Sequence, residues 1–399
     1  MELNTTPSAE RLHIGFFGMR NAGKSSLVNA VTGQNLSVVS DVKGTTTDPV
    51  KKAMELLPQG PVVIIDTPGL DDEGELGALR VKKAWEALTI TDIAVLVVDA
   101  AVGLGDADLA LKKELQTRKI PFLVAFNKCD LYQKETLVDA NELYVSAQSG
   151  EGVEDLKNRL GAFAKSLKTP NYVIRDLLQK NDLVVLVTPI DEAAPKGRLI
   201  LPQQMVLRDI LDAHASSLVC QDTELKETLS ALSKKPRMVI TDSQVFGKVA
   251  KDTPRDIPLT SFSILMARYK GDLATQVKGF SALKNLRDGD RVLIAEGCTH
   301  HRQCNDIGTV KMPKWIEDFT GVKPAYSFTS GGEFPNDLRE YRAIIHCGGC
   351  MLNEAAMKHR IATAAEQGVP IVNYGIAIAG MHGILSRSLE LFPDLLKLL

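Results

Sequence analysis

The sequence has little net charge, few aromatic residues and no long hydrophobic run. Its net charge is −2, which disfavours a protein that coats nucleic acid, because such domains are strongly basic. The longest apolar runs, such as Ile93–Val98, are too short to span a bilayer. The N-terminal segment MELNTTPSAERLH lacks the apolar stretch of a secretory signal. We therefore expect a cytoplasmic protein that binds neither nucleic acid nor membrane.

Cysteine is also scarce. Six cysteines in 399 residues are too few for a disulfide scaffold. Four of the six lie between Cys298 and Cys350, and clustered cysteines in a reducing compartment indicate metal ligands or catalytic thiols. The two ends of the chain are therefore expected to carry different chemistry.

Short apolar strands alternate with amphipathic helices up to about Leu167, which predicts a parallel α/β sheet. After the expected linker Lys168–Asn171 the same mixture returns, with a further boundary near Pro254–Pro258. We predict an α/β protein with a P-loop domain and two smaller α/β domains with largely parallel sheets, over residues 9–168, 169–262 and 263–399. The expected strands are Ile14–Phe17, Val62–Asp66, Ile93–Val98, Phe122–Phe126, Leu143–Val145, Leu183–Thr188, Met238–Thr241, Arg291–Ala295, Ala343–His346 and Ile371–Tyr374.

A glycine-rich loop follows the first apolar strand and opens a helix expected over Lys24–Val31. Its sequence, GMRNAGKS from Gly18 to Ser25, fits the phosphate-binding pattern GxxxxGKS. The glycines let backbone N–H groups approach phosphate oxygens, and the helix N-terminus adds partial positive charge. The lysine reaches the outer phosphates and the serine binds magnesium. The predicted phosphate-binding residues are Gly18, Asn21, Ala22, Gly23, Lys24, Ser25 and Ser26.

Three further motifs end later strands and predict a guanine nucleotide. Asp66-Thr67-Pro68-Gly69 offers the Asp66 carboxylate to magnesium through water and the Gly69 amide to the third phosphate. In Asn127-Lys128-Cys129-Asp130, the last carboxylate accepts two hydrogen bonds from guanine groups that adenine lacks, and such a site rejects the wrong analogue by roughly 10⁴-fold. Ser146-Ala147 fits the loop behind the base. The motifs lie at carboxyl ends of strands, as in other α/β nucleotide sites.

These motifs resemble those of the translation-factor-like GTPases, in the branch of the tRNA-modification GTPase TrmE and the ribosome-associated GTPase Era. The stretch GTTTD from Gly44 to Asp48 resembles that branch's GTTRD switch motif, with Thr47 in place of the usual arginine. The resemblance implies that Thr46 binds magnesium and that Asn21 binds potassium. Leu70 follows where Ras has a catalytic glutamine, so we expect slow, potassium-stimulated hydrolysis. The expected catalytic residues are Lys24, Thr46, Asp66 and Gly69.

Cysteine and histidine follow two strands of the last unit. One strand leads into Glu296-Gly297-Cys298-Thr299-His300-His301, and another into His346-Cys347-Gly348-Gly349-Cys350. Three thiols at strand ends fit an iron–sulfur cluster, a zinc site of Cys₃His type, or a redox pair of the last two cysteines. Spacing favours zinc and iron–sulfur about equally over the redox pair. The candidates for a further ligand are Glu296, His300 and His346.

A GTPase domain followed by Cys-x-His and then His-Cys-x-x-Cys resembles HydF, the maturation GTPase family of iron–iron hydrogenases, over essentially the whole chain. The resemblance implies a 4Fe–4S cluster on Cys298, Cys347 and Cys350. It implies a homodimer formed through the middle unit, and a scaffold that assembles a di-iron precursor and delivers it to apo-hydrogenase. The implied partners are the radical-SAM maturases HydE and HydG and the hydrogenase, with GTP or GDP, Mg²⁺ and K⁺ as ligands. The alternatives are an RNA GTPase of the TrmE or Era kind and a zinc-stabilised regulatory GTPase.

Overall fold

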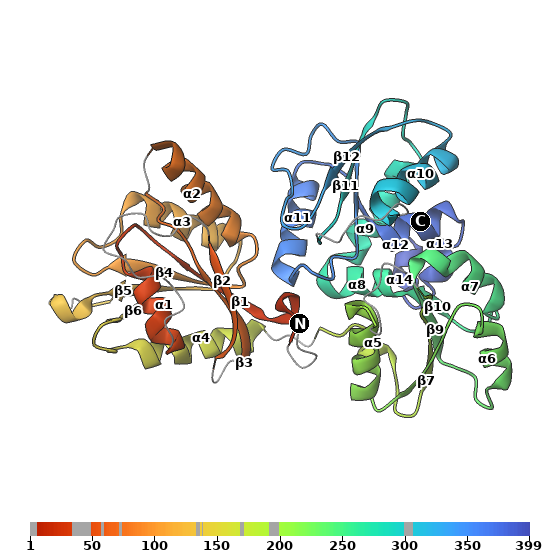
Figure 1. Ribbon diagram of the computed structural model, residues 1–399, viewed down its shortest axis with the longest axis horizontal. Coiled ribbons are helices and arrows are strands. Elements are labelled where there is room, and N and C mark those ends of the chain that lie inside the picture. The colour runs from red at the N-terminus through yellow and green to blue at the C-terminus, as the bar shows by residue number, and fades with distance from the viewer. Residues whose placement is uncertain are drawn as a thin grey trace. The chain divides into compact units, whose positions relative to one another are not determined.

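The computed structural model describes residues 6–33, 49–56, 60–71, 74–132, 136–137, 139–167, 171–190, 199–298 and 306–399. The predicted site residues Thr46 and His300, and the rest of the stretch Gly44–Asp48, lie outside these ranges. The chain divides into two compact units, Met1–Pro170 and Asn171–Leu399. Each unit alternates strands with helices along the chain (Figure 1).

The first unit is built on one six-stranded sheet in the order β2-β3-β1-β4-β5-β6. All neighbours pair in parallel except β2, which runs antiparallel to β3. The strands are β1 (Leu12–Phe17), β2 (Val50–Leu56), β3 (Gly60–Asp66), β4 (Ile93–Asp99), β5 (Phe122–Asn127) and β6 (Glu142–Tyr144). Because the five parallel strands share a direction, the loops that follow them meet at one edge of the sheet.

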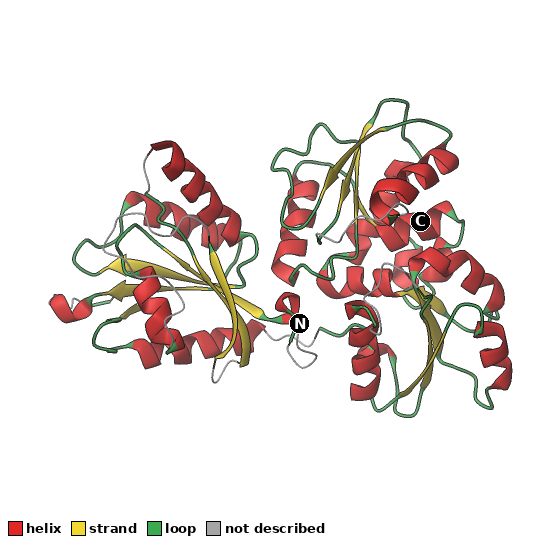
Figure 2. Cartoon of the chain, viewed as in Figure 1, coloured by secondary structure: helices red, strands yellow, loops and turns green. Residues whose placement is uncertain are grey.

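Helices cover both faces of this sheet, which is why the central strands are apolar without alternation. Side chains of α1 and α4 pack with Ile14 and Phe16 on one face, and side chains of α2 and α3 pack with Phe17 and Ile65 on the other. Figure 2 shows this layering of red helices around yellow strands. The helices are α1 (Lys24–Thr32), α2 (Gly74–Leu88), α3 (Asp106–Thr117) and α4 (Val153–Leu167).

The second unit contains two four-stranded sheets, and all of their strand pairs are parallel. The first sheet has the order β10-β9-β7-β8 and the second the order β12-β11-β13-β14. The strands of the first are β7 (Leu183–Val187), β8 (Ser216–Cys220), β9 (Met238–Thr241) and β10 (Leu259–Ser261). Those of the second are β11 (Arg291–Ala295), β12 (Ala325–Thr329), β13 (Ala343–His346) and β14 (Ile371–Asn373).

One apolar core joins the two sheets of the second unit. Val185 of β7, Ile294 of β11 and Ile376 of α12 (Tyr374–Met381) belong to the same cluster of buried side chains. Every residue of α12 from Tyr374 to Ala379 is buried, which explains its uniformly apolar sequence. The other helices of the unit are α5 (Leu201–Asp212), α6 (Leu225–Ala231), α7 (Phe246–Asp252), α8 (Phe262–Lys270), α9 (Leu273–Leu283), α10 (Met312–Thr320), α11 (Glu354–Glu366), α13 (Leu385–Ser388) and α14 (Pro393–Leu396).

The predicted fold class, an α/β protein with largely parallel sheets, is confirmed. Each of the expected strands is present to within one or two residues at its ends. Sequence reasoning did not find β2, β8, β10 or β12, and each of these is an edge strand. Among the helices of the described residues, none is both long enough and apolar enough to cross a membrane.

Candidate functional site

The phosphate-binding loop leaves β1 and enters α1 through two glycines that no other residue can replace without strain. Gly18 has φ +143°, and a Cβ there would lie 2.1 Å from the carbonyl oxygen of Val97. Gly23 caps α1 with φ +85°, and a Cβ there would lie 2.3 Å from Nδ2 of Asn127. These close approaches and left-handed conformations require glycine. The two glycines therefore allow a tight loop between β1 and α1, and the N-terminus of α1 faces the inside of that loop.

Three polar side chains meet inside this loop. The Lys24 ammonium is buried and donates hydrogen bonds to the carbonyl oxygens of Gly18, at 3.0 Å, and Met19, at 2.8 Å. The Ser25 hydroxyl donates to Oδ2 of Asp66 at 2.6 Å. The sequence motifs at the ends of β1 and β3 are therefore brought together as the pattern requires for a phosphate and a divalent cation.

Asn127 links the base-binding motif to the phosphate loop. Its side-chain amide donates to the Ala22 carbonyl oxygen at 2.9 Å, and its Oδ1 accepts from the backbone N–H of Ala147 at 3.1 Å. Asn127 is only 1% exposed, whereas Asp130 is exposed. Lys128 has φ +65° and pairs with Asp99 at 2.6 Å. Three of the sequence motifs thus form one connected network.

Gly69 and Leu70, which follow β3, pack against the phosphate-binding loop and the core of the domain. Gly69 lies against the backbone of Arg20, so a Cβ at Gly69 would be 3.1 Å from the Arg20 nitrogen. Leu70 is 8% exposed and packs into the apolar cluster of Phe17 and Ala84. Its side chain is therefore held in the core of the domain. Asn21 is exposed and adopts φ +63°.

Two carboxylates near this site escaped sequence reasoning. Asp71 accepts a hydrogen bond from the backbone N–H of Arg20 at 2.5 Å. Asp108, at the start of α3, is 1% exposed, and its Oδ2 accepts from the Gly105 N–H at 3.1 Å. Burial raises the pKa of Asp108, the Gly105 N–H lowers it, and the charge of Asp71 raises it further. Neither carboxylate belongs to one of the sequence motifs, so only the folded structure reveals its place near this site.

The second candidate site lies where β11 and β13 end. The two loops touch, since a Cβ at Gly297 would lie 3.4 Å from Cα of Gly349 and 2.8 Å from the Leu352 side chain. The parallel register that places Ala295 beside His346 brings Cys298 and Cys347 to the same edge of the sheet. Cysteines 298, 347 and 350 form no disulfide with another described cysteine.

The Cys347 sulfur accepts two backbone hydrogen bonds. Gly297 donates at 3.0 Å and Gly349 at 3.4 Å. Burial nevertheless raises the pKa of the Cys347 thiol to about 11, against a smaller opposing effect of the two N–H groups, and Cys350 and Glu296 raise it further. In the metal-free protein this thiol is therefore protonated at neutral pH, and a metal that binds it displaces the proton.

The described candidates for a further ligand differ in availability. His346 is fully buried, its Nδ1 donates to the Cys347 carbonyl oxygen at 2.7 Å, and its Nε2 accepts from Arg360 at 2.9 Å. Burial, aided by Arg360, lowers the pKa of His346 to about 3, so the ring is neutral and both nitrogens are occupied. Glu296 lies near Cys347, and its Oε1 accepts from the Tyr374 hydroxyl at 3.3 Å.

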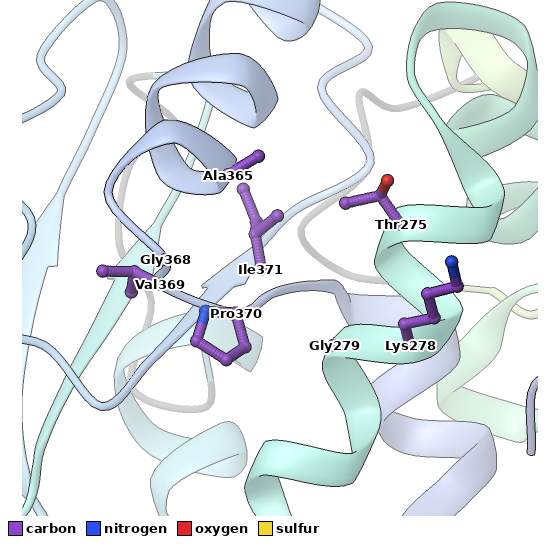
Figure 3. A pocket seen from close by; sticks show the side chains of 8 residues that line it. All are labelled: Thr275, Lys278, Gly279, Ala365, Gly368, Val369, Pro370 and Ile371. Atoms are coloured by element: carbon purple, nitrogen blue, oxygen red, sulfur yellow. The ribbon is translucent and has the colours of Figure 1, made fainter.

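Within the described ranges, no three histidine, cysteine or acidic side chains converge on a point where a single metal ion would sit. A shallow pocket of the second unit lies elsewhere, where β14 begins, and not where β11 and β13 end (Figure 3). Its lining combines α9 with the segment that leads from α11 into β14: Thr275, Lys278, Gly279, Ala365, Gly368, Val369, Pro370 and Ile371.

The chain resembles curated GTPases over its first part. It is 35% identical over 153 residues to the tRNA modification GTPase MnmE of Thiobacillus denitrificans, which covers 38% of this chain and 33% of the relative. It is 28% identical over 220 residues to GTPase Der of Kosmotoga olearia, which covers 50% and 49%. The chain thus spans between a third and a half of the length of these relatives. A solved structure of Aquifex aeolicus Era matches with 15% identity and a TM-score of 0.35, over 80% of this chain and 93% of Era.

Family models match three consecutive parts of the chain. Residues 13–128 match the 50S ribosome-binding GTPase family, so the N-terminal domain is a GTPase domain. Residues 173–271 match the hydrogen maturase F dimerization domain, and residues 274–391 match the hydrogen maturase F tetramerization domain. The two hydrogen maturase F models together span most of the second unit. The chain therefore belongs to the hydrogen maturase F family, with a GTPase domain ahead of that family's two assembly domains.

Proposed function

We propose that this chain is a cytoplasmic GTP-hydrolysing scaffold that binds a 4Fe–4S cluster and assembles and delivers a di-iron precursor to apo iron–iron hydrogenase. The observation that carries this proposal is the succession of a GTPase domain and two hydrogen maturase F domains in one chain. The cysteines at the ends of β11 and β13 support it.

In the nucleotide site, we assign Lys24 to the outer phosphates, Ser25 to Mg²⁺ directly and Asp66 to Mg²⁺ through water. The 2.6 Å contact between Ser25 and Asp66 supports these roles, because the two side chains already face one point. Thr46 is the second proposed protein ligand of Mg²⁺, and the Gly69 amide is the proposed contact to the third phosphate. Base recognition falls to Asn127, Lys128, Asp130, Ser146 and Ala147, and phosphate recognition to Gly18, Asn21, Ala22, Gly23 and Ser26.

Intrinsic hydrolysis is expected to be slow, on the order of 10⁻³ to 10⁻² s⁻¹, as in unassisted GTPases. Leu70 supports this expectation, because an apolar side chain held in the core orients no water. Asn21 is exposed on the loop and is our candidate for a potassium ligand. The test compares turnover in K⁺ and Na⁺ for wild type and Asn21→Ala. Equal rates in the two salts in wild type would remove potassium from the proposal.

For the cluster, we assign Cys298, Cys347 and Cys350 as thiolate ligands. The two N–H bonds to the Cys347 sulfur fit this role, since hydrogen bonds to cysteine sulfur stabilise thiolates bound to iron–sulfur clusters. Bound there, the cluster would supply an iron with an exchangeable position for the incoming precursor. Glu296 is our choice to occupy that position reversibly, because both nitrogens of His346 are engaged.

The decisive test is anaerobic reconstitution with iron and sulfide, followed by electron paramagnetic resonance after dithionite reduction. Wild type should give a reduced 4Fe–4S signal, and the Cys298→Ala, Cys347→Ala, Cys350→Ala triple variant should give none. Cys220→Ala is the matched control, because this thiol lies on β8, outside the cysteine loops. A wild-type protein that gives no paramagnetic resonance signal and holds one zinc ion would favour a zinc-stabilised regulatory GTPase over the cluster-binding scaffold.

The chain carries dimerization and tetramerization domains, and we propose a homodimer formed through the first of them. Strand β8 is an edge of its sheet and exposes Val219, which suits pairing with a second copy. We propose further that the third phosphate of GTP changes the affinity for a maturase or the hydrogenase. Partner dissociation rates that are the same with and without GTP, and in Lys24→Ala, would contradict the switch.

An RNA GTPase is the alternative, supported by the identity to MnmE over the GTPase domain. The proposal above is favoured because the remainder of the chain matches hydrogen maturase F domains, and the net charge of −2 offers little to a phosphate backbone. Binding of transfer RNA with a steep salt dependence would instead favour the RNA GTPase over the maturation scaffold.

A further inference from the structure

The nucleotide site contains an acidic side chain that none of the roles assigned above uses. Leu70, which follows Gly69, is 8% exposed and packs into the apolar cluster of Phe17, so it offers no acceptor to a water. Hydrolysis of GTP requires that the attacking water be held in line with the third phosphate, and GTPases use a polar side chain for this. The next residue along the chain, Asp71, carries the polar group that Leu70 lacks.

Asp71 is bound to the phosphate-binding loop itself. Its Oδ1 accepts a hydrogen bond at 2.5 Å from the backbone N–H of Arg20, the third residue of the loop. The preceding two residues, Gly18 and Met19, accept the hydrogen bonds of the Lys24 ammonium. The outer phosphates of a nucleotide meet this lysine. The Asp71 carboxylate therefore lies on the part of the loop that holds the phosphate-binding lysine.

Gly69 meets the loop at the same point. A Cβ at Gly69 would lie 3.1 Å from the Arg20 nitrogen and 3.1 Å from Oδ1 of Asp71. The backbone of Gly69, the loop and the Asp71 carboxylate are thus neighbours. The Gly69 amide is the group proposed above to contact the third phosphate, so a phosphate bound there comes close to the Asp71 carboxylate.

A second carboxylate borders this side of the loop. Asp108, at the start of α3, is 1% exposed, and a Cβ at the preceding Gly105 would lie 3.9 Å from the Met19 side chain. Burial raises the pKa of Asp108, and the charges of Asp71 and Lys24 act on it in opposite directions. The two carboxylates are thus within electrostatic reach of each other. Asp71 is only half-buried, so it is the one of the two that a water from solvent can reach.

We propose that Asp71 is a catalytic residue of GTP hydrolysis, which orients the attacking water and accepts a proton from it. The water oxygen forms a bond to the phosphorus of the third phosphate, and the bond from that phosphorus to the bridging oxygen breaks. The electron pair of the broken bond stays on GDP, and one water proton passes to the Asp71 carboxylate, which releases it to solvent. The inference rests on the nucleotide-binding roles of the proposed function and is independent of the cluster.

The test measures single-turnover GTP hydrolysis by the full-length protein with Mg²⁺. Asp71→Asn keeps an oxygen for the Arg20 N–H but cannot take up the proton, so its rate should fall about 100-fold, as on loss of a general base. Asp71→Glu retains a carboxylate on a longer side chain and should recover part of this loss. Asp106→Asn is the matched control, because it removes an exposed charge from the start of α3, and it should keep the wild-type rate.

Nucleotide affinities distinguish this role from mere support of the loop. In Asp71→Asn, the affinity for the non-hydrolysable β,γ-imido analogue of GTP should rise about fivefold relative to that for GDP, because the carboxylate repels a third phosphate that GDP lacks. A residue that only shapes the loop would change both affinities alike. An unchanged affinity ratio, or a loss of rate below about tenfold, overturns the proposal and leaves the nucleotide-binding roles intact. A wild type that binds neither nucleotide overturns those roles as well.

Discussion

At the scale of single residues, the base recognition proposed above depends on one exposed carboxylate. Asp130 follows a buried network in which Asn127 bonds both the phosphate loop and Ala147. Asn127 is thus fixed by two hydrogen bonds in a buried setting, whereas Asp130 is exposed. A change at Asp130 should therefore alter specificity and leave the fold unchanged.

We expect Asp130→Asn to weaken GTP binding roughly 10- to 100-fold, because hydrogen bonds to a charged acceptor contribute about 1.5–3 kcal/mol. The amide can instead donate to the 2-oxo group of xanthine, so xanthosine triphosphate should bind better than in wild type. Equilibrium titration with fluorescent analogues of both nucleotides measures this change in nucleotide preference. Asp139→Asn, an exposed carboxylate paired with Lys112, is the control. Unchanged preference in Asp130→Asn would contradict the assigned role.

A second prediction at this scale concerns the pH dependence of stability that arises from His346. Its folded pKa of about 3 lies below the ordinary value of 6.5, so the folded protein binds fewer protons than the unfolded chain. The stability contributed by the neutral ring is fully present above pH 6.5 and is lost as the pH falls toward 3. At pH 5 the loss is about 2 kcal/mol, at 1.36 kcal/mol per pKa unit.

His346→Gln should remove this pH dependence from the second unit. Urea unfolding at pH 7 and pH 5, followed by Trp315 fluorescence in a Trp85→Phe background, reports on that unit alone, because the chain has one tryptophan in each unit. The exposed residue His214, changed to Asn, is the control. If wild type and His346→Gln lose the same stability between the two pH values, the ring is not the titrating group.

At the scale of elements, the second sheet depends on a close approach between α9 and β14. Gly279 faces the strand so closely that a Cβ there would lie 2.1 Å from the Ile371 carbonyl oxygen. Gly279→Ala should therefore destabilise the second unit by roughly 1–3 kcal/mol, as overpacking does. Gly247, in α7, faces open space, so Gly247→Ala should stabilise by about 0.5–1 kcal/mol. Thermal unfolding distinguishes the two signs, and a stabilised Gly279→Ala would refute this packing.

The elements also indicate which parts of the fold the sequence could predict. Central strands such as β4 and β13 are buried on both faces and read as apolar runs. Strand β2 is mostly exposed and carries Lys51 and Lys52, and β12 is only half-buried, so neither has a hydrophobic signature. Their positions are set by pairing with β3 and β11, which is information that lies outside their own segments.

The candidate sites also combine residues that the sequence could predict with contacts that it could not. The nucleotide motifs are local in the sequence, because one loop or one strand end supplies each set of contacts. Lys270 and Cys350 are 80 residues apart and meet only in the folded chain. His346 was expected among the possible ligands from its place in the motif, but its partner Arg360 arrives from α11 and occupies the second ring nitrogen. Contacts of this kind depend on how the helices and strands pack, so no spacing of residues along the sequence predicts them.

At the scale of the whole molecule, the chain consists of two compact units with one tryptophan each, Trp85 and Trp315. We expect two unfolding transitions in calorimetry, because each unit has its own apolar core. Mg²⁺ with GDP at 100 times its Kd should stabilise the first unit by about 2.7 kcal/mol and raise its Tm by roughly 5–10 °C. Trp315 should report no shift, and Lys24→Ala should abolish the shift seen by Trp85. A Trp315 transition that moves together with that of Trp85 would instead mean that nucleotide binding stabilises the second unit as well, without any partner.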